Sequence, residues 1–313
     1  LRGMDSIKWL EALSAPFLLL VGLLLVWWAW GAADGFGPIF SQPSRLGTDE
    51  AFWPVFGAGL TAMVGYWATL SLNIPDFSRY ARDQRAQITG QAIGLPTTMT
   101  LYSFVGIMVT GATVVIFGES LWDPVKLIAR IGSPAVSALA LVILAVATLS
   151  TNIAANVVSP ANDFSNLNPR RISFRTGGLI TAFIGVLMFP WKLYEDPSGY
   201  IFTWLIGYSA LLGPIAGIMI ADYFVIRRRY LDVDDLYRSR GVYRYSGGFS
   251  LVGFAALFLA VLPNLPGFLA AVHWAPAEAF PSWLVAGYHY AWFVGFALAF
   301  LLYTTLRKLF PNR

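Results

Sequence analysis

The chain has 313 residues, of which 57% are hydrophobic and 16% aromatic, while only 12% are charged. This composition is typical of a polytopic membrane protein and excludes an ordinary soluble domain of this length. The absence of cysteine excludes disulfides, thiolate metal sites and cysteine nucleophiles, and two histidines, His273 and His289, are too few for a metal centre. The net charge of +4 does not indicate a nucleic-acid partner, because the basic residues lie in loops between apolar runs.

Stretches without Asp, Glu, Lys or Arg define the candidate membrane spans, since a bilayer core of roughly 30 Å needs about 20 apolar residues of helix. Eight such stretches follow one another, so we predict an all-α polytopic membrane protein with eight transmembrane helices in this chain. The predicted spans cover residues 12–32, 51–73, 90–117, 134–158, 176–192, 200–226, 249–272 and 283–306.

The sequence before the first span, LRGMDSIKWLEALSAP, has neither a basic signal-peptide region nor a cleavage site. The simplest interpretation is that the chain is a piece of a longer protein whose earlier helices are absent.

The second span places Trp67 well inside the outer aromatic belt. A bulky core residue explains a Trp there if its indole N–H finds a partner, whereas the functional interpretation is a stacking plate for a flat ring. Gly57, Gly59 and Gly65 in the same span permit close approach or local unwinding, as in the binding helices of transporters.

The fourth span ends in the polar string STNIAANVVSPAND. At about 100° per residue, its polar side chains form two arcs of the helix. Ala147, Ser150 and Thr151 form a small, hydroxyl-bearing arc suited to a small hard cation. Asn152 and Asn156 form a carboxamide arc with Ser159, suited to a planar ligand with amide or imide groups. The alternative is helix packing, for which small and hydroxyl residues and Asn are also used.

The sixth span contains Gly213 and Pro214 in mid-helix, which predicts a bend of the kind a gate requires. The loop after it, RRRYLDVDDLYRSRGVYRY, is basic and rich in Tyr, which favours a topological role and contact with anionic lipid.

Basic residues fall on alternate sides of the predicted spans very unequally. All but four of the 21 Lys and Arg lie on the side of the two termini and of the 227–245 loop, and the exceptions are Arg45, Lys126, Arg130 and Lys192. The positive-inside rule therefore predicts that both ends of this chain are cytoplasmic. No span carries a central ionisable residue, His289 being nearest to an exception, and this favours a neutral ligand.

Three strings closely resemble the nucleobase–cation symporter-1 family, which includes the bacterial sodium–hydantoin transporter and the allantoin, uracil and cytosine permeases. They are GYWATLSLNIPDFSRYARD, ATLSTNIAANVVSPANDFSN and GPIAGIMIADYFVIRRRYLDVDDLYRSRGVY. Members have twelve helices in the leucine-transporter (LeuT) fold, with two inverted five-helix repeats. The resemblance implies that residues 1–313 form a single transmembrane transporter domain, a partial LeuT-type fold truncated at its N-terminus and corresponding to helices five to twelve.

The resemblance implies roles for single residues. Trp67 matches the tryptophan that stacks on the substrate, and Asn156 matches the asparagine that hydrogen-bonds it. Asn152 shares the arc of Asn156 and is grouped with the substrate-binding residues, although we assign it only a structural role.

For the coupling ion, Ala147 matches a backbone carbonyl ligand of Na⁺, and Ser150 and Thr151 match the hydroxyl ligands. Leu205 corresponds to the thin extracellular gate, and Pro214 supplies the bend. The family's first and third helices, which complete these sites, lie outside the chain.

The resemblance implies a secondary transporter that couples Na⁺ or H⁺ to symport of a neutral planar nitrogen heterocycle across the cytoplasmic membrane by alternating access. The expected partners are the heterocycle, the lipid bilayer and the missing four N-terminal helices, with no cofactor besides the coupling ion. An integral-membrane enzyme would need a nucleophile, acid pair or metal cluster at membrane depth, and none is visible. A truncated, non-transporting product with an interaction role only is the remaining alternative.

Overall fold

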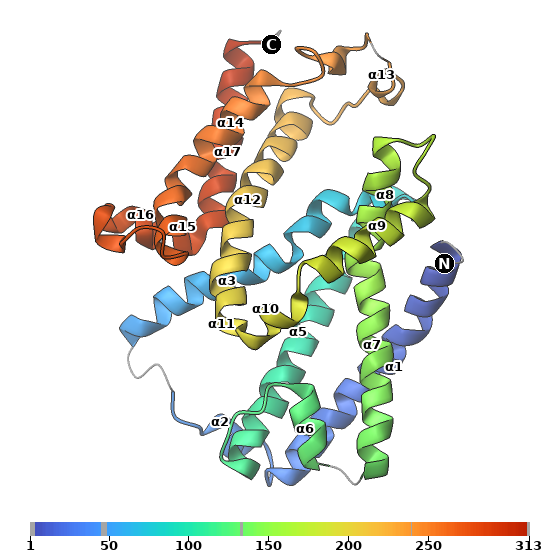
Figure 1. The fold of residues 1–313 in the computed structure, drawn as a ribbon, viewed down its shortest axis with the longest axis vertical. Coiled ribbons are helices and arrows are strands. Elements are labelled where there is room, and N and C mark those ends of the chain that lie inside the picture. Colours follow the sequence, from blue (N-terminus) through green and yellow to red (C-terminus); the bar gives the residue numbers. More distant parts are fainter. Residues whose placement is uncertain (1–3, 45–48, 132–133, 239, 312–313) are drawn as a thin grey trace. The chain divides into compact units, whose positions relative to one another are not determined.

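The computed structural model describes residues 4–44, 49–131, 134–238 and 240–311, and in these ranges every regular element is a helix (Figure 1). The chain divides into two compact units. Unit 1 comprises residues 1–45 and 75–188, and unit 2 comprises residues 46–74 and 189–313.

Unit 1 packs α5 against α1 and α2, and α7 against α1, α6 and α8. Its helices are α1 (Met4–Ala32), α2 (Phe36–Phe40), α4 (Pro75–Ser78), α5 (Gln84–Phe117), α6 (Pro124–Ile131), α7 (Pro134–Asn156), α8 (Val158–Leu167) and α9 (Phe174–Leu187).

Unit 2 is built around α12, which packs on α3, α14 and α17. Its helices are α3 (Asp49–Asn73), α10 (Pro190–Glu195), α11 (Pro197–Gly199), α12 (Ile206–Ile220), α13 (Val233–Leu236), α14 (Leu251–Val261), α15 (Leu265–Ala271), α16 (Ser282–Gly287) and α17 (Ala291–Leu309). Two π-helical segments, η1 (Tyr200–Leu205) and η2 (Ala221–Ile226), flank α12, and single 3₁₀ turns are η3 (Val242–Arg244), η4 (Leu262–Asn264), η5 (Ala277–Ala279) and η6 (Tyr288–Tyr290).

Six helical stretches of the described residues are long and apolar enough to cross a membrane. They are Ala12–Ala32, Gln84–Phe117, Ser137–Leu167, Tyr200–Ile226, Leu251–Ala271 and Ser282–Leu309. The other two predicted spans correspond to α3 and to α9, which has only 14 residues. The all-helical prediction is confirmed, while the number of eight spans stays a prediction.

Helix ends follow from local chemistry. α5 begins at Gln84, earlier than the predicted residue 90, because the Asp83 carboxylate accepts a hydrogen bond from the backbone N–H of Ala86 at 2.7 Å. This bond and the neighbouring Arg82 lower the pKa of the Asp83 carboxyl. α9 ends at Leu187, not at residue 192, because Phe189 adopts a left-handed backbone conformation and Pro190 has no N–H to continue the helix.

Glycines permit close contact between α12 and α17. A Cβ atom on Gly213 would lie 2.4 Å from the carbonyl oxygen of Trp292, and one on Gly217 would lie 2.4 Å from that of Phe296. From the other helix, a Cβ on Gly295 would lie 2.7 Å from Cδ of Pro214. Small residues spaced four apart are a common device for bringing membrane helices together.

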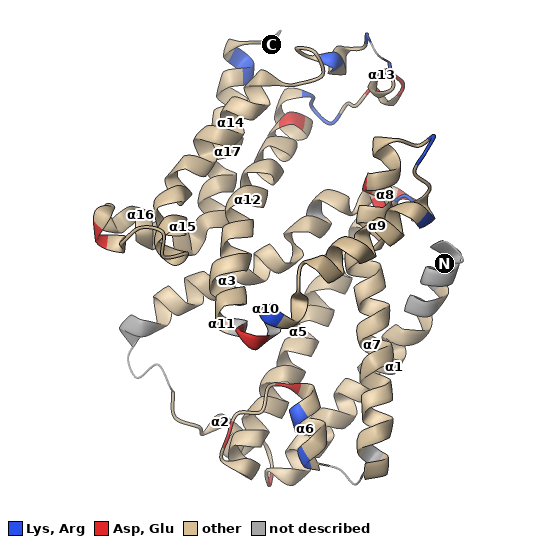
Figure 2. Ribbon diagram, in the orientation of Figure 1, with Lys and Arg blue, Asp and Glu red and all other residues tan. Residues whose placement is uncertain are grey.

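Apart from Lys192 in α10, the described basic residues of unit 2 lie at the end where α17 finishes and α13 lies (Figure 2). There the Asp222 carboxylate accepts hydrogen bonds from Nε of Arg227 at 2.5 Å and from the Tyr303 hydroxyl at 2.7 Å. Arg227 also donates to the Tyr245 hydroxyl at 2.5 Å and stacks on Tyr243, 4.5 Å from the ring centre. This network ties η2, the following loop and α17 together.

We expect Gly213→Ala to lower the free energy of unfolding by about 1–3 kcal/mol, because the added methyl group collides with backbone that side-chain motion cannot clear. The measurement is the thermal unfolding midpoint of the purified protein in detergent. Gly59→Ala is the control. A Cβ atom at Gly59 would have no other atom within 4 Å, and Gly59 lies in α3, a helix of the same unit. Equal midpoints for the two variants would contradict the close packing of α12 on α17.

Candidate functional site

The hydroxyl arc of α7 is built from residues one turn apart. Ser150 is buried, 1% exposed, and its Oγ donates to the backbone carbonyl of Ala147 at 3.0 Å. Two of the three predicted cation ligands are therefore adjacent oxygens, and the Ser150 hydroxyl oxygen, which donates in this bond, keeps lone pairs that can face an ion. Thr151 lies on an exposed part of the same helix.

The carboxamide arc contains a direct hydrogen bond. Nδ2 of Asn156 donates to Oδ1 of Asn152 at 2.7 Å, across one turn of α7. The bond orients both amides, so that Oδ1 of Asn156 is directed to accept and Nδ2 of Asn152 is directed to donate.

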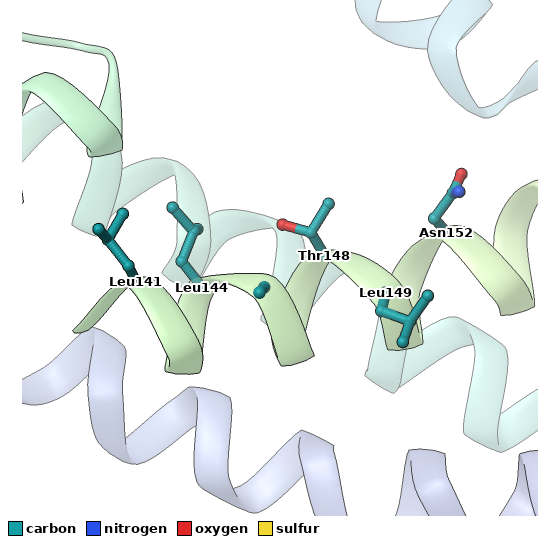
Figure 3. A pocket seen from close by; sticks show the side chains of 6 residues that line it. Leu141, Leu144, Thr148, Leu149 and Asn152 are labelled. Atoms are coloured by element: carbon teal, nitrogen blue, oxygen red, sulfur yellow. The ribbon is translucent and has the colours of Figure 1, made fainter. Parts of the chain in front are cut away.

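A shallow open hollow of about 480 Å³ follows the same face of α7 and ends at Asn152 (Figure 3). Thr148 and Asn152 project from one side of the helix, one turn apart. All the lining residues belong to α7, so the hollow is a helix face and not an enclosed cavity; they are Leu141, Leu144, Ala145, Thr148, Leu149 and Asn152. Sequence reasoning missed Thr148, although its position four residues before Asn152 is a signal for the same face.

α7 ends at Asn156 for a local reason. Pro160 has no N–H to donate to the Asn156 carbonyl, and the chain breaks at Val157 before continuing as α8. α8 is held by α9, because a Cβ on Gly177 would lie 2.5 Å from the carbonyl oxygen of Ala161. The Asn156 side chain therefore stands beside a backbone carbonyl that lacks its helical donor.

Trp67 lies in α3, in unit 2, whereas the α7 residues lie in unit 1. Its indole Nε1 is buried without a hydrogen-bond partner among the described residues, and its ring meets that of Tyr66 edge to face at 5.4 Å. Interhelical bonds fix the preceding turn of α3. Thr61 donates to the carbonyl of His289 at 2.5 Å, and Ser209 lies 3.2 Å from the carbonyl of Thr61.

The two predicted gate residues are both buried in unit 2. Leu205 ends the π-helical segment η1 and packs in a core cluster with Ala58 and Ala62 of α3. Its carbonyl accepts a hydrogen bond from Ser209 at 2.7 Å. Pro214 lies where α12 meets α17, so in this structure it contributes to packing as well as removing a helical hydrogen bond.

The family model described as a permease for cytosine/purines, uracil, thiamine and allantoin matches residues 1–295. The chain belongs to this family. The nucleobase–cation symporter-1 resemblance is thereby confirmed.

The chain is 46% identical over 312 residues to the allantoin permease of Bacillus subtilis, covering 99% of this chain and 61% of that permease. It is 44% identical over 304 residues to the purine-uracil permease NCS1 of Arabidopsis thaliana, covering 96% of this chain and 50% of that permease.

Among solved structures, the chain resembles Mhp1, a nucleobase-cation-symport-1 family transporter, in a closed conformation with bromovinylhydantoin bound. The TM-score is 0.72 at 28% identity, covering 99% of this chain and 65% of Mhp1. This likeness confirms a LeuT-type helical fold. The family's relatives are permeases and transporters, which agrees with the expectation that the chain is not an enzyme.

The absence of native cysteine permits a direct test of which face of α7 is open to water. We expect a single cysteine at Thr148, an exposed position beside Asn152, to react with a membrane-impermeant thiol reagent at least about tenfold faster than one at buried Ser150. The rates are measured by mass shift. Equal rates would mean that the two faces do not differ in access.

Proposed function

We propose that the chain is the substrate- and cation-binding part of a secondary transporter that carries a neutral, planar nitrogen heterocycle across the cytoplasmic membrane. The hydrogen bond between Asn152 and Asn156 is the observation that supports this most directly. It leaves an amide oxygen and an amide N–H on one face of a membrane-length helix, without a charged group beside them.

This pair suits a ring whose edge carries an N–H next to a carbonyl. The ring N–H donates to Oδ1 of Asn156, and the ring carbonyl accepts from Nδ2 of Asn152. Nucleobases, allantoin and hydantoin all present such an edge. A charged ligand fits poorly, because the six lining residues of the α7 hollow are apolar, hydroxyl or carboxamide side chains.

Trp67 supplies the stacking surface in this proposal. Its unpartnered indole N–H is a costly group to bury, by roughly 1–3 kcal/mol, and a polar ligand atom offsets that cost. Stacking with one or two amide hydrogen bonds supplies several kcal/mol, which corresponds to micromolar affinity.

The coupling ion in our proposal is Na⁺, or H⁺ in its place, at the hydroxyl arc. The Ala147 carbonyl and the Ser150 hydroxyl, 3.0 Å apart, offer hard oxygen ligands, and Thr151 completes the set from this helix. The similarity to a cation-symport transporter supports this assignment.

Transport then proceeds by alternating access. In this proposal α7 belongs to a rigid scaffold, and α3 and α5 rock against that scaffold. The segment from η1 through α12 bends at Leu205 and Pro214 and so opens or closes the gate. The π-helical winding of η1 supports this role, since such segments are frequent at functional sites. Both ends of the chain are cytoplasmic in this orientation, as the distribution of basic residues indicates.

We expect Asn156→Ala to raise the KM for uptake about tenfold, because a hydrogen bond worth about 1.4 kcal/mol is lost. Uptake of radiolabelled uracil, allantoin and hydantoin is measured in cells that express the complete reading frame. Trp67→Ala should weaken uptake at least as much. Asn166→Ala, an exposed amide in α8, is the matched control and should transport normally. Unchanged uptake by both site variants would refute the site.

Replacing external Na⁺ by choline tests the coupling ion separately. With sodium coupling, uptake falls and Ser150→Ala shifts the Na⁺ dependence to higher concentration, because one hydroxyl ligand is lost. Undiminished uptake in choline, together with dependence on a pH gradient, would assign the coupling to H⁺.

A further inference from the structure

Hydrogen bonds hold the described residues of the loop between η2 and α14 in a defined conformation. Asp232 caps α13 by accepting from the N–H of Asp235 at 3.0 Å, and the Tyr243 hydroxyl accepts from the N–H of Asp232 at 2.9 Å. Asp235, in turn, accepts from the N–H of Val242 at 2.5 Å. Together with Arg227 and Tyr245, these bonds fix the loop to the ends of η2 and α17.

The same bonds divide the arginines of the loop into two groups. Arg227 is neutralised by Asp222, and Arg238 lies 3.6 Å from Asp235. Among the described residues, the ion pairs of this loop involve only these two arginines. Arg228, Arg240 and Arg244 are exposed and lie outside these pairs, as does Arg229, which stacks on the Phe224 ring, while Asp234 is an exposed carboxylate outside them. The loop therefore presents a net positive surface on a fixed frame (Figure 2).

Large apolar and aromatic side chains are exposed on this loop as well. Tyr230 is 72% exposed, Tyr237 87%, Val242 69% and Phe249 61%. Arginine together with exposed Tyr and Phe is typical of a protein surface at the level of the lipid headgroups. There the aromatic rings contact the boundary of the acyl chains, and the guanidinium groups contact phosphate.

The position of the loop fits this composition. It leaves one candidate membrane span at Ile226 and enters the next at Leu251, so both of its ends lie at the same membrane surface. The segment between them stays within reach of the headgroups.

We propose that the described residues of this loop, 227–238 and 240–250, form a binding surface for the phosphate headgroup of an anionic phospholipid, with Arg228, Arg240 and Arg244 as its ligands. The loop contains none of the substrate and cation residues, and the proposal holds whether or not the transport assignment does. Backbone hydrogen bonds hold the chain on either side of these arginines, from Tyr230 to Arg227, from Gly241 to Arg238 and from Arg244 to Gly241. Guanidinium groups suit this ligand because they pair bidentately with phosphate.

The test uses the purified protein from its complete reading frame in phosphatidylcholine nanodiscs with and without phosphatidylglycerol. We expect phosphatidylglycerol to raise the thermal unfolding midpoint. Arg240→Gln/Arg244→Gln should lose most of this rise, because two lost contacts weaken an anionic headgroup site about thirty-fold. Its midpoint in phosphatidylcholine alone should equal that of the unaltered protein, which shows that the loop still folds.

Arg170→Gln/Arg171→Gln is the matched control, since it removes two exposed arginines from the turn between α8 and α9. It should keep the full rise. If both variants lost the same part of the rise in unfolding midpoint, the effect would come from general surface charge and the site would be refuted. A full rise in the loop variant would also refute the site. An equal rise with free inorganic phosphate, added to phosphatidylcholine nanodiscs, would overturn the lipid assignment.

Discussion

A polar group in an apolar surrounding must find its hydrogen-bond partner within the protein, and this constraint organises the whole chain. In unit 2 it joins neighbouring helices, because Thr61 donates to the carbonyl of His289 and the Ser209 hydroxyl lies 3.2 Å from the carbonyl of Thr61. In α7 the same constraint turns Ser150 toward the carbonyl of Ala147 and pairs Asn156 with Asn152. Helix contacts and candidate ligand groups thus arise from one physical requirement.

The requirement is not met at some residues, and Trp67, to which we assign function, is one of them. The indole N–H of Trp67 is buried without a partner among the described residues. Pro160 deprives the Asn156 carbonyl of its helical donor, and the Asn152 bond directs the Asn156 side-chain oxygen outward. Unmet polar groups at membrane depth are costly, so their retention at these positions is consistent with partners that a ligand supplies.

Close packing holds one part of the span Tyr200–Ile226 more firmly than the other. Gly213 and Gly217 bring α12 against the backbone of α17, and Asp222 fixes η2 through Arg227 and Tyr303. The opposite end, η1, is wound as a π-helix and carries Leu205. Because η2 is also π-helical but is held by Arg227 and Tyr303, we place the bend of the gate toward η1.

The sequence by itself determined the helical class, the loops that collect basic residues, and the two faces of α7, because these depend on composition and on the fixed angle between successive residues of a helix. The sequence motifs also identified the family, and the match of the permease family model to residues 1–295 confirmed it. It did not determine that α9 stops at Leu187, that Asn152 orients Asn156, or that Gly213 serves close packing on α17. Only the tertiary structure decided these, because each depends on the backbone conformation at one residue or on an atom that another turn or helix brings within bonding distance.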